Sequence, residues 1–179
     1  MRIKKRIILN AEGIQSALEE MAFRITEDFP PAGQLVLIGI RTGGAFLADR
    51  LRDLILARKT QAVITGALDI TLYRDDWTRI NHKPIVGKTE VPVSLDDQFV
   101  ILVDDVLYTG RTVRSALDAL IDFGRPKRIA LAVLVDRGGR ELPICADYVG
   151  IQVQALAQER VNVYFQELKQ SEQVIVEGG

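Results

Sequence analysis

Residues 100–112 constrain the fold of this chain more than any other part of its sequence. An apolar run at residues 100–103 has the length and the β-branched side chains of a fully buried strand, and Asp104 and Asp105 follow it directly. This order predicts that the strand ends where the two carboxylates begin. A loop of small and hydroxylated residues comes next, and a helical pattern of apolar residues then continues until Gly124.

The loop before this helix has the composition of a phosphate site. Gly110 allows backbone N–H groups at the start of the helix to approach an anion, and Thr109 and Thr112 add hydroxyl donors. Two adjacent carboxylates repel each other, so they favour a sugar diol, a hydrated divalent metal, or both, as ligands. Phosphate and diol together indicate a ribose phosphate.

One alternative to a ribose phosphate site is that the acidic residues merely cap a turn and that Thr109 merely starts a helix. The common phosphate-binding loops are excluded, because the Lys of G-x-x-x-x-G-K-[ST] is missing and residues 39–44 lack the spacing of G-x-G-x-x-G.

Residues 100–112 resemble the phosphoribosyl diphosphate (PRPP) signature of the type I phosphoribosyltransferases. The resemblance implies that Asp104 and Asp105 hold the ribose hydroxyls and that the following loop holds the 5′-phosphate. It also implies an α/β fold with a mostly parallel twisted sheet flanked by helices, a small hood and a flexible lid loop. The PRPP- and nucleotide-binding residues that it implies are Arg41, Thr42, Gly43, Asp104, Asp105, Val106, Leu107, Tyr108, Thr109, Gly110, Arg111 and Thr112.

Length and composition favour a single domain over residues 1–179. The chain is 47% hydrophobic and 26% charged, which suits one α/β domain with a sizeable core. No apolar run approaches membrane-spanning length, and only three apolar residues follow the basic start, so we expect a cytoplasmic protein without a signal peptide. The single Cys145 and single His82 exclude an internal disulfide and a cysteine–histidine zinc site.

The expected elements alternate as in a doubly wound sheet. A helix from Asn10 should end before the two prolines at 30 and 31, and a second helix should follow Gly44. The expected strands lie at residues 35–40, 62–72, 100–103 and 129–135, with a closing antiparallel pair at 161–166 and 173–176.

Three suggestive loops, at residues 41–44, 104–112 and 136–140, each follow an apolar strand. Parallel strands bring such loops to one edge of a sheet, so we expect these three loops to share one edge. The first loop resembles the pyrophosphate-binding loop of the family, although alone it could be a plain strand-to-helix turn.

A long polar segment at about residues 73–92 is expected to be the lid. Its family counterpart closes over PRPP, and this assigns Arg74 and Arg79 a catalytic role beside Asp104 and Asp105, with assistance from nearby lysines. The alternative is a solvated hairpin with a surface tryptophan.

Residues 134–150 and 68–76 resemble one branch of the family, the bifunctional pyrimidine-operon regulators with uracil phosphoribosyltransferase activity. Tyr108 stands where the 6-oxopurine branch places an extra acid. The implied reaction converts uracil and PRPP to UMP and pyrophosphate, with Mg²⁺ carried by PRPP and water near the acidic residues. The implied hood covers about residues 136–160 plus the C-terminal antiparallel strands. The implied base and hood residues are Val106, Asp136, Arg137, Gly138 and Arg140; either arginine could instead form a surface salt bridge.

The same branch also binds a leader RNA, and its members look like homo-oligomers, dimers or larger. Here the expected cations are fewer: Cys145, Gly139 and Ile151 occupy positions that are commonly Arg, His and Lys in the resembling proteins, and the net charge is −1. Two other hypotheses therefore stay open. One is an RNA-binding attenuation regulator that senses UMP or PRPP, and the other is a phosphoribosyltransferase of different base specificity or a PRPP sensor.

Overall fold

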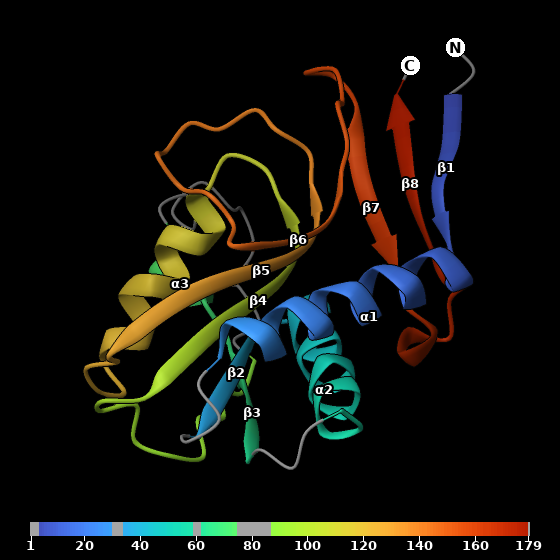
Figure 1. Ribbon diagram of the computed structural model, residues 1–179. Coiled ribbons are helices and arrows are strands. Elements are labelled where there is room, and N and C mark those ends of the chain that lie inside the picture. Colours follow the sequence, from blue (N-terminus) through green and yellow to red (C-terminus); the bar gives the residue numbers. More distant parts are fainter. Residues whose placement is uncertain (1–3, 30–33, 59–61, 75–86, 179) are drawn as a thin grey trace.

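The computed structural model describes residues 4–29, 34–58, 62–74 and 87–178, which form two β-sheets and three α-helices (Figure 1). The main sheet is parallel throughout, in the order β3-β2-β4-β5-β6. Its strands are β2 (Leu35–Ile40), β3 (Val63–Leu68), β4 (Phe99–Leu107), β5 (Arg128–Asp136) and β6 (Tyr148–Gln152).

Helices cover both faces of this sheet, as the predicted α/β class requires (Figure 1). On one face lie α1 (Ala11–Asp28), which Asn10 caps by accepting a hydrogen bond from Gly13 N, and α2 (Gly43–Leu56). On the other face lies α3 (Arg111–Ile121).

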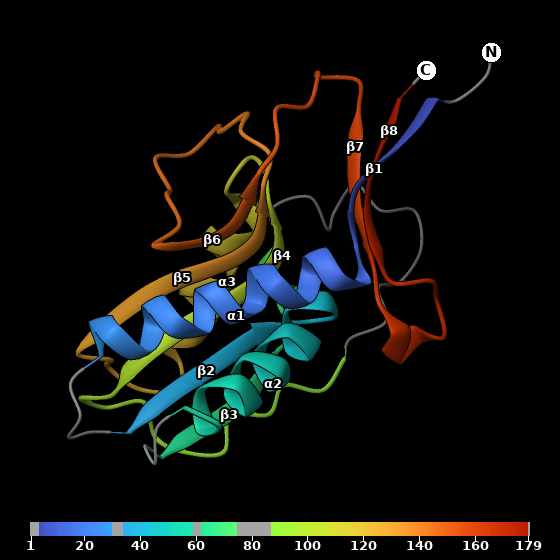
Figure 2. The same ribbon diagram turned by 45° about the vertical axis from the view of Figure 1, so that its right-hand side comes forward.

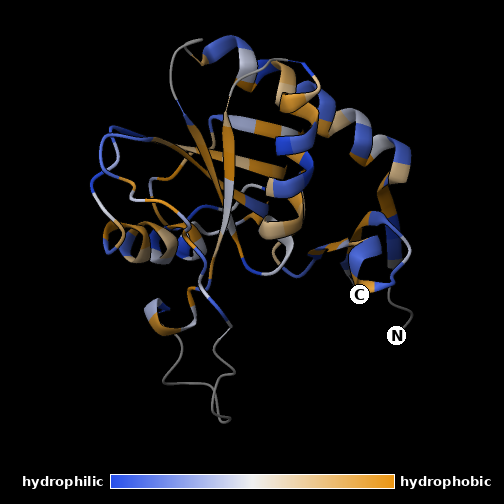
Figure 3. Cartoon of the chain, turned by 90° about the horizontal axis from the view of Figure 1, so that it is seen from below, coloured by the Kyte–Doolittle hydropathy of each residue, from blue (hydrophilic) through white to orange (hydrophobic). Residues whose placement is uncertain are grey.

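Alternate residues of each strand enter two separate cores, because successive side chains point to opposite faces. In β4, Ile101 and Val103 pack in the cluster that contains α1 and α2, whereas Val100 and Leu102 pack in the cluster that contains α3. Figure 3 shows mostly hydrophobic strands between helices in which hydrophilic and hydrophobic residues alternate.

A second sheet of three antiparallel strands stands beside the first, in the order β1-β8-β7 (Figure 2). It contains β1 (Lys4–Asn10), β7 (Arg160–Tyr164) and β8 (Gln173–Gly178). The closing antiparallel pair was predicted, but β1 and β6 were not. A short basic start gave no sign that residues 4–10 would pair with β8.

Two predicted strand ends were wrong. The strand before the acidic residues does not end at Val103: pairing with β2 stops there, but pairing with β5 continues from Asp104 to Leu107, so the carboxylates lie within β4. The strand predicted to reach residue 72 ends at Leu68, because the chain turns into the 3₁₀ helix η1 (Thr71–Tyr73).

Within the described part of the chain, none of the helices combines the length and the apolar character that crossing a membrane demands.

The contact between β2 and the first turn of α2 leaves no room for a side chain at Gly39. A Cβ there would lie 2.5 Å from the backbone N of Ala45. We expect Gly39→Ala to lower the free energy of unfolding by roughly 1–3 kcal/mol, the usual effect of overpacking, as measured by urea denaturation. Gly13→Ala in α1 is the matched control, since its Cβ would meet chiefly the terminal methyl of Leu9 at 3.0 Å. Equal losses in the two variants would contradict the packing argument.

Candidate active site

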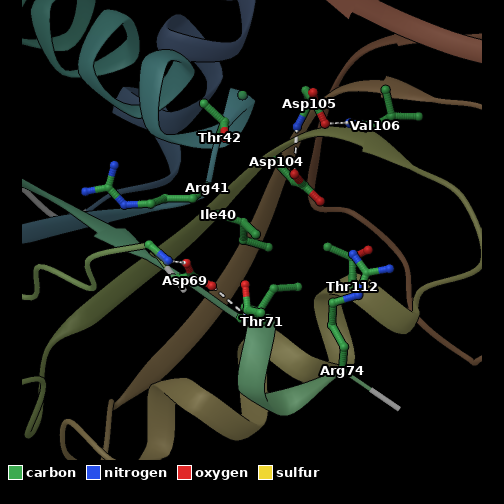
Figure 4. Close-up of a pocket in the computed structure, with 13 residues that line it drawn as sticks. Ile40, Arg41, Thr42, Asp69, Thr71, Arg74, Asp104, Asp105, Val106 and Thr112 are labelled. Atoms are coloured by element: carbon green, nitrogen blue, oxygen red, sulfur yellow. Dashed lines mark hydrogen bonds between the residues drawn. The ribbon is translucent and has the colours of Figure 1, made fainter. Parts of the chain in front are cut away.

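The carboxyl ends of β2, β3 and β4 surround a cavity of about 450 Å³, which we call the first cavity (Figure 4). Such an edge is where open parallel sheets bind ligands. Eight of its lining residues were predicted site residues: Arg41, Thr42, Gly43, Arg74, Asp104, Asp105, Val106 and Thr112. The others are Ile40, Asp69, Ile70, Thr71 and Gly87.

Asp104 and Asp105, the acidic pair, form one wall of the first cavity. Asp104 is 6% exposed and accepts a hydrogen bond of 3.0 Å from Asp105 N, and Asp105 accepts one of 2.8 Å from Val106 N. Burial, and then the neighbouring charge of Asp105, raise the pKa of Asp104 well above its ordinary value. Burial also raises the pKa of Asp105. Ionisation of both carboxyl groups is thus unfavourable, and hydroxyl donors or a cation would stabilise the ionised pair.

The start of α2 packs directly against this pair. A Cβ on Gly43 would lie 2.9 Å from the Asp105 carboxyl carbon and 2.8 Å from the Phe165 ring, so only glycine fits here. The peptide between Arg41 and Thr42 is cis. The Arg41 side chain extends away from the pair (Figure 4), donating 2.6 Å to Lys88 O and lying 3.5 Å from the Glu90 carboxylate.

Asp69 is a lining residue that the sequence interpretation did not assign. Its carboxylate accepts hydrogen bonds from Thr71 N at 2.7 Å and from Gly87 N, and its own N–H donates to the Thr89 hydroxyl. Burial alone would raise the pKa of Asp69, but these donors and the Arg41 charge outweigh burial and lower it. The position of Asp69 directly after β3 was the available signal.

The predicted phosphate loop runs from the end of β4 to the start of α3. Gly110 has φ of 92°, a left-handed conformation that favours glycine, and Thr109 Oγ1 accepts a bond of 3.3 Å from Arg111 N. Arg111 points outward to Glu141, 2.7 Å away. Thr112, in the first turn of α3, faces the first cavity.

The third predicted loop packs on the phosphate loop, as the shared-edge prediction requires. Arg137 N donates to Leu107 O at 3.1 Å, and the Arg137 guanidinium stacks 3.7 Å from the centre of the Tyr108 ring. Arg137 is 7% exposed, so it is not the surface salt bridge considered as an alternative. Arg140 pairs with Asp136 at 2.6 Å and donates to Tyr108 O at 2.8 Å. Gly138 N donates to the same Asp136 carboxylate at 2.9 Å.

A second cavity, of about 390 Å³, adjoins the first and shares Asp105 and Val106 with it. Its opposite wall comes from β7 and the following turn. The lining residues there are Val161, Asn162, Val163, Tyr164, Leu168 and Gln170. The C-terminal strands were predicted to be part of the hood, but base contacts were predicted only at Val106 and in residues 136–140.

Residues 75–86 of the predicted lid lie outside the described residues. Arg79 is among residues 75–86, as are Lys83, His82 and Trp77, and its catalytic role stays a prediction. In the described ranges, no group of three or more His, Cys, Asp or Glu side chains could hold a metal ion.

Comparisons with known proteins agree on one family. The model of the phosphoribosyl transferase domain matches residues 6–166. The "Bifunctional protein PyrR" of Syntrophobacter fumaroxidans is 52% identical over 172 residues, covering 96% of this chain and 92% of that protein. The protein of the same name from Pelotomaculum thermopropionicum is 52% identical over 176 residues, covering 98% and 97%.

Solved structures share the fold at lower identity. The hypoxanthine phosphoribosyltransferase of Trypanosoma cruzi has a TM-score of 0.71 at 21% identity, covering 96% of this chain and 95% of that one. One from Staphylococcus aureus has a TM-score of 0.70 at 22% identity, covering 95% and 90%.

Burial of the acidic pair predicts a stability that depends on pH. The pKa of Asp104 is raised in the folded state, so ionisation of its carboxyl group destabilises the folded protein. This destabilisation is absent below the pKa of Asp in the unfolded state, about 4, and it grows as the pH rises above that value. We expect Asp104→Asn to raise the free energy of unfolding at pH 7 by roughly 1–3 kcal/mol, and the gain to vanish towards pH 4.

Thermal unfolding at several pH values measures this difference. The control is Asp97→Asn, at an exposed position with φ of 57°, a conformation that Asn tolerates. A gain in Asp104→Asn that is the same at pH 4 and pH 7 would rule out the electrostatic cause.

Proposed function

This chain belongs to the phosphoribosyltransferase family and to its PyrR branch, and on that premise we propose that it is a uracil phosphoribosyltransferase. The reaction is the transfer of a phosphoribosyl group from PRPP to uracil, which gives UMP and pyrophosphate. The observation that carries the proposal is the junction of two cavities at Asp105 and Val106, with room for a ribose phosphate on one side and a base on the other.

The first cavity is the proposed PRPP site. Ribose hydroxyls would donate to the acidic pair, whose donors among the described residues are backbone N–H groups of β4. Thr112 and the N–H groups that start α3 would take the 5′-phosphate, because a helix N-terminus after Gly110 favours an anion. Residues 41–43 would take the diphosphate, with Arg74 supplying positive charge from the rim.

Mg²⁺ fits this site only as a companion of PRPP. The described residues offer the two carboxylates of the acidic pair and no larger cluster of ligands, so diphosphate, ribose and water oxygens would complete the coordination. When bound, the ion neutralises charge on the departing diphosphate. The acidic pair would hold it through ribose hydroxyls or water.

The second cavity is the proposed base site. Among the described residues, β7 is the outer strand of its sheet, and four consecutive residues of β7 line the cavity across from Val106, as an edge without a partner strand would. A uracil ring against Val106 could exchange hydrogen bonds with such an edge, since free backbone edges present alternating donors and acceptors. This placement differs from the predicted contact with residues 136–140, which instead hold the phosphate loop through Tyr108.

Catalysis would consist of positioning and charge stabilisation. The bond from ribose carbon 1 to the diphosphate oxygen breaks, and its electron pair leaves with the diphosphate. A bond from ribose carbon 1 to the base nitrogen forms, and the N–H proton of the base passes to the departing diphosphate or to water. Ribose carries positive charge between these events, and the buried acidic pair lies close enough to stabilise it. The shared residues Asp105 and Val106 keep the two reactants adjacent.

The test is formation of UMP from uracil, PRPP and Mg²⁺, run beside hypoxanthine, guanine and orotate. We expect turnover selective for uracil, and a loss of roughly a hundredfold or more in the variant Asp104→Asn/Asp105→Asn, because two groups that bind and stabilise the sugar are neutralised. Asp97→Asn is the matched control and should retain activity. Turnover with a purine instead, or tight PRPP binding without turnover of any base, would refute the proposal.

Binding of a leader RNA is the second candidate function, favoured by the word "bifunctional" in the relatives' name. All three positions where cations are missing are described: Cys145 is exposed, Ile151 lies in β6, and Gly139 packs on Tyr108, where a Cβ would lie 2.6 Å from the ring. Filter binding of a leader transcript, with and without UMP and at two salt concentrations, tests it.

A homo-oligomer, expected from the family, is tested by sedimentation.

A further inference from the structure

Arg50 on α2 forms the densest ionic contact described in this chain outside the first cavity. Its Nε and Nη2 donate to the two carboxylate oxygens of Glu167 at 2.8 Å each, and its Nη1 lies 2.5 Å from the carboxylate of Glu172. The side chains of Arg50, Glu167 and Glu172 are only 17%, 31% and 12% exposed. A bidentate pair that is shielded from water fixes geometry far better than a surface pair does.

Both carboxylates belong to the turn between β7 and β8. Glu167 lies in the 3₁₀ helix η3 (Gln166–Leu168), and Glu172 directly precedes β8. The same turn supplies Leu168 and Gln170 to the wall of the second cavity. Arg50 therefore holds, from α2, the two ends of a segment whose middle faces the proposed base site.

The other end of α2 reaches the first cavity. Phe165 connects the two ends: the Arg50 guanidinium lies 5.9 Å from its ring centre, its ring packs 5.6 Å from that of Phe46, and it contacts Gly43 beside Asp105. One rigid helix thus positions the diphosphate loop at its start and the base-cavity turn two turns later.

We infer that Arg50 is a positioning residue for the base: its contacts with Glu167 and Glu172 fix the turn that forms one wall of the second cavity. This inference rests on the proposed function, because it takes the second cavity to be the base site. Arg50 does not line either cavity, so it acts through the turn and not on the substrate.

Steady-state kinetics of Arg50→Gln test the inference. We expect the KM for uracil to rise about tenfold or more, since small displacements of a binding wall have large effects, while the KM for PRPP and kcat stay within about twofold. Equilibrium binding of UMP should weaken in parallel. Arg52→Gln is the matched control on the same helix, because the partners of Arg52 among the described residues are its neighbours Asp49 and Asp53 and also Thr65. The KM of this variant for uracil should not change.

Two further variants keep the test decisive. Glu172→Gln removes one of the two contacts, so it should raise the KM for uracil by less than Arg50→Gln does. Arg50→Lys keeps the charge but not the bidentate geometry, so its KM for uracil should lie between the values of the wild type and of Arg50→Gln. If Arg50→Gln fails to fold, these two variants supply the measurement. An unchanged KM for uracil, or equal changes in the KM for uracil and PRPP, would overturn the inference. Absence of UMP formation by the wild-type protein would instead refute the proposed function.

Discussion

The burial of Asp104 and the partial burial of the adjacent Asp105, both within the second half of β4, are the constraint on which the arrangement of this site depends. Neither carboxylate has a cationic partner among the described ion pairs, and the hydrogen bonds shown for them come from backbone N–H groups of the same strand. Such an arrangement is unfavourable in the free protein, because desolvation and mutual repulsion both oppose ionisation. It becomes favourable when a ligand brings hydroxyl donors and a cation, so part of the binding energy of PRPP would come from relieving this penalty.

The neighbouring elements are shaped by the need to approach these carboxylates closely. Gly39 allows α2 to lie on β2, and Gly43 allows the first turn of α2 to touch Asp105. On the opposite side, Gly110 turns the chain into α3 so that Thr112 faces the same cavity. Each of these three glycine positions excludes a side chain for a different steric reason. Together they place the N-termini of α2 and α3 around the acidic pair, where the positive ends of the two helix dipoles interact favourably with negative charge.

Much of this could be predicted from the sequence, because the informative signals are local. The strand and helix after residue 99, the acidic pair and the phosphate loop are contiguous in the chain, and a loop that follows a parallel strand must lie at the ligand-binding edge. The missed features depend on distant pairing. Asp69 gains its role only when residues 87–89 fold back on it, β1 becomes a strand only through β8, and β7 becomes a cavity wall only because it lies across from Val106. The strand end at Val103 was misplaced because one neighbour of β4 stops there while the other continues.

In the proposed function, the edge of β7 that has no partner among the described strands connects the architecture to base recognition. An unpaired strand edge is a liability in a soluble protein, since it invites pairing with another chain, and it persists where a helix, a loop or a ligand covers it. Here the edge faces a cavity whose other wall is Val106, and the turn that follows it is fixed to α2 by Arg50. A planar base with donors and acceptors on its edge matches such a strand, and an apolar side chain matches its face.

A strand held in this way can discriminate between bases by the order of its backbone donors and acceptors, because a mismatched base would leave one of them buried and unpaired. Specificity would then depend on how rigidly the small sheet is fastened to the main one, which is a property of α2 and its ionic contacts more than of any side chain that touches the base.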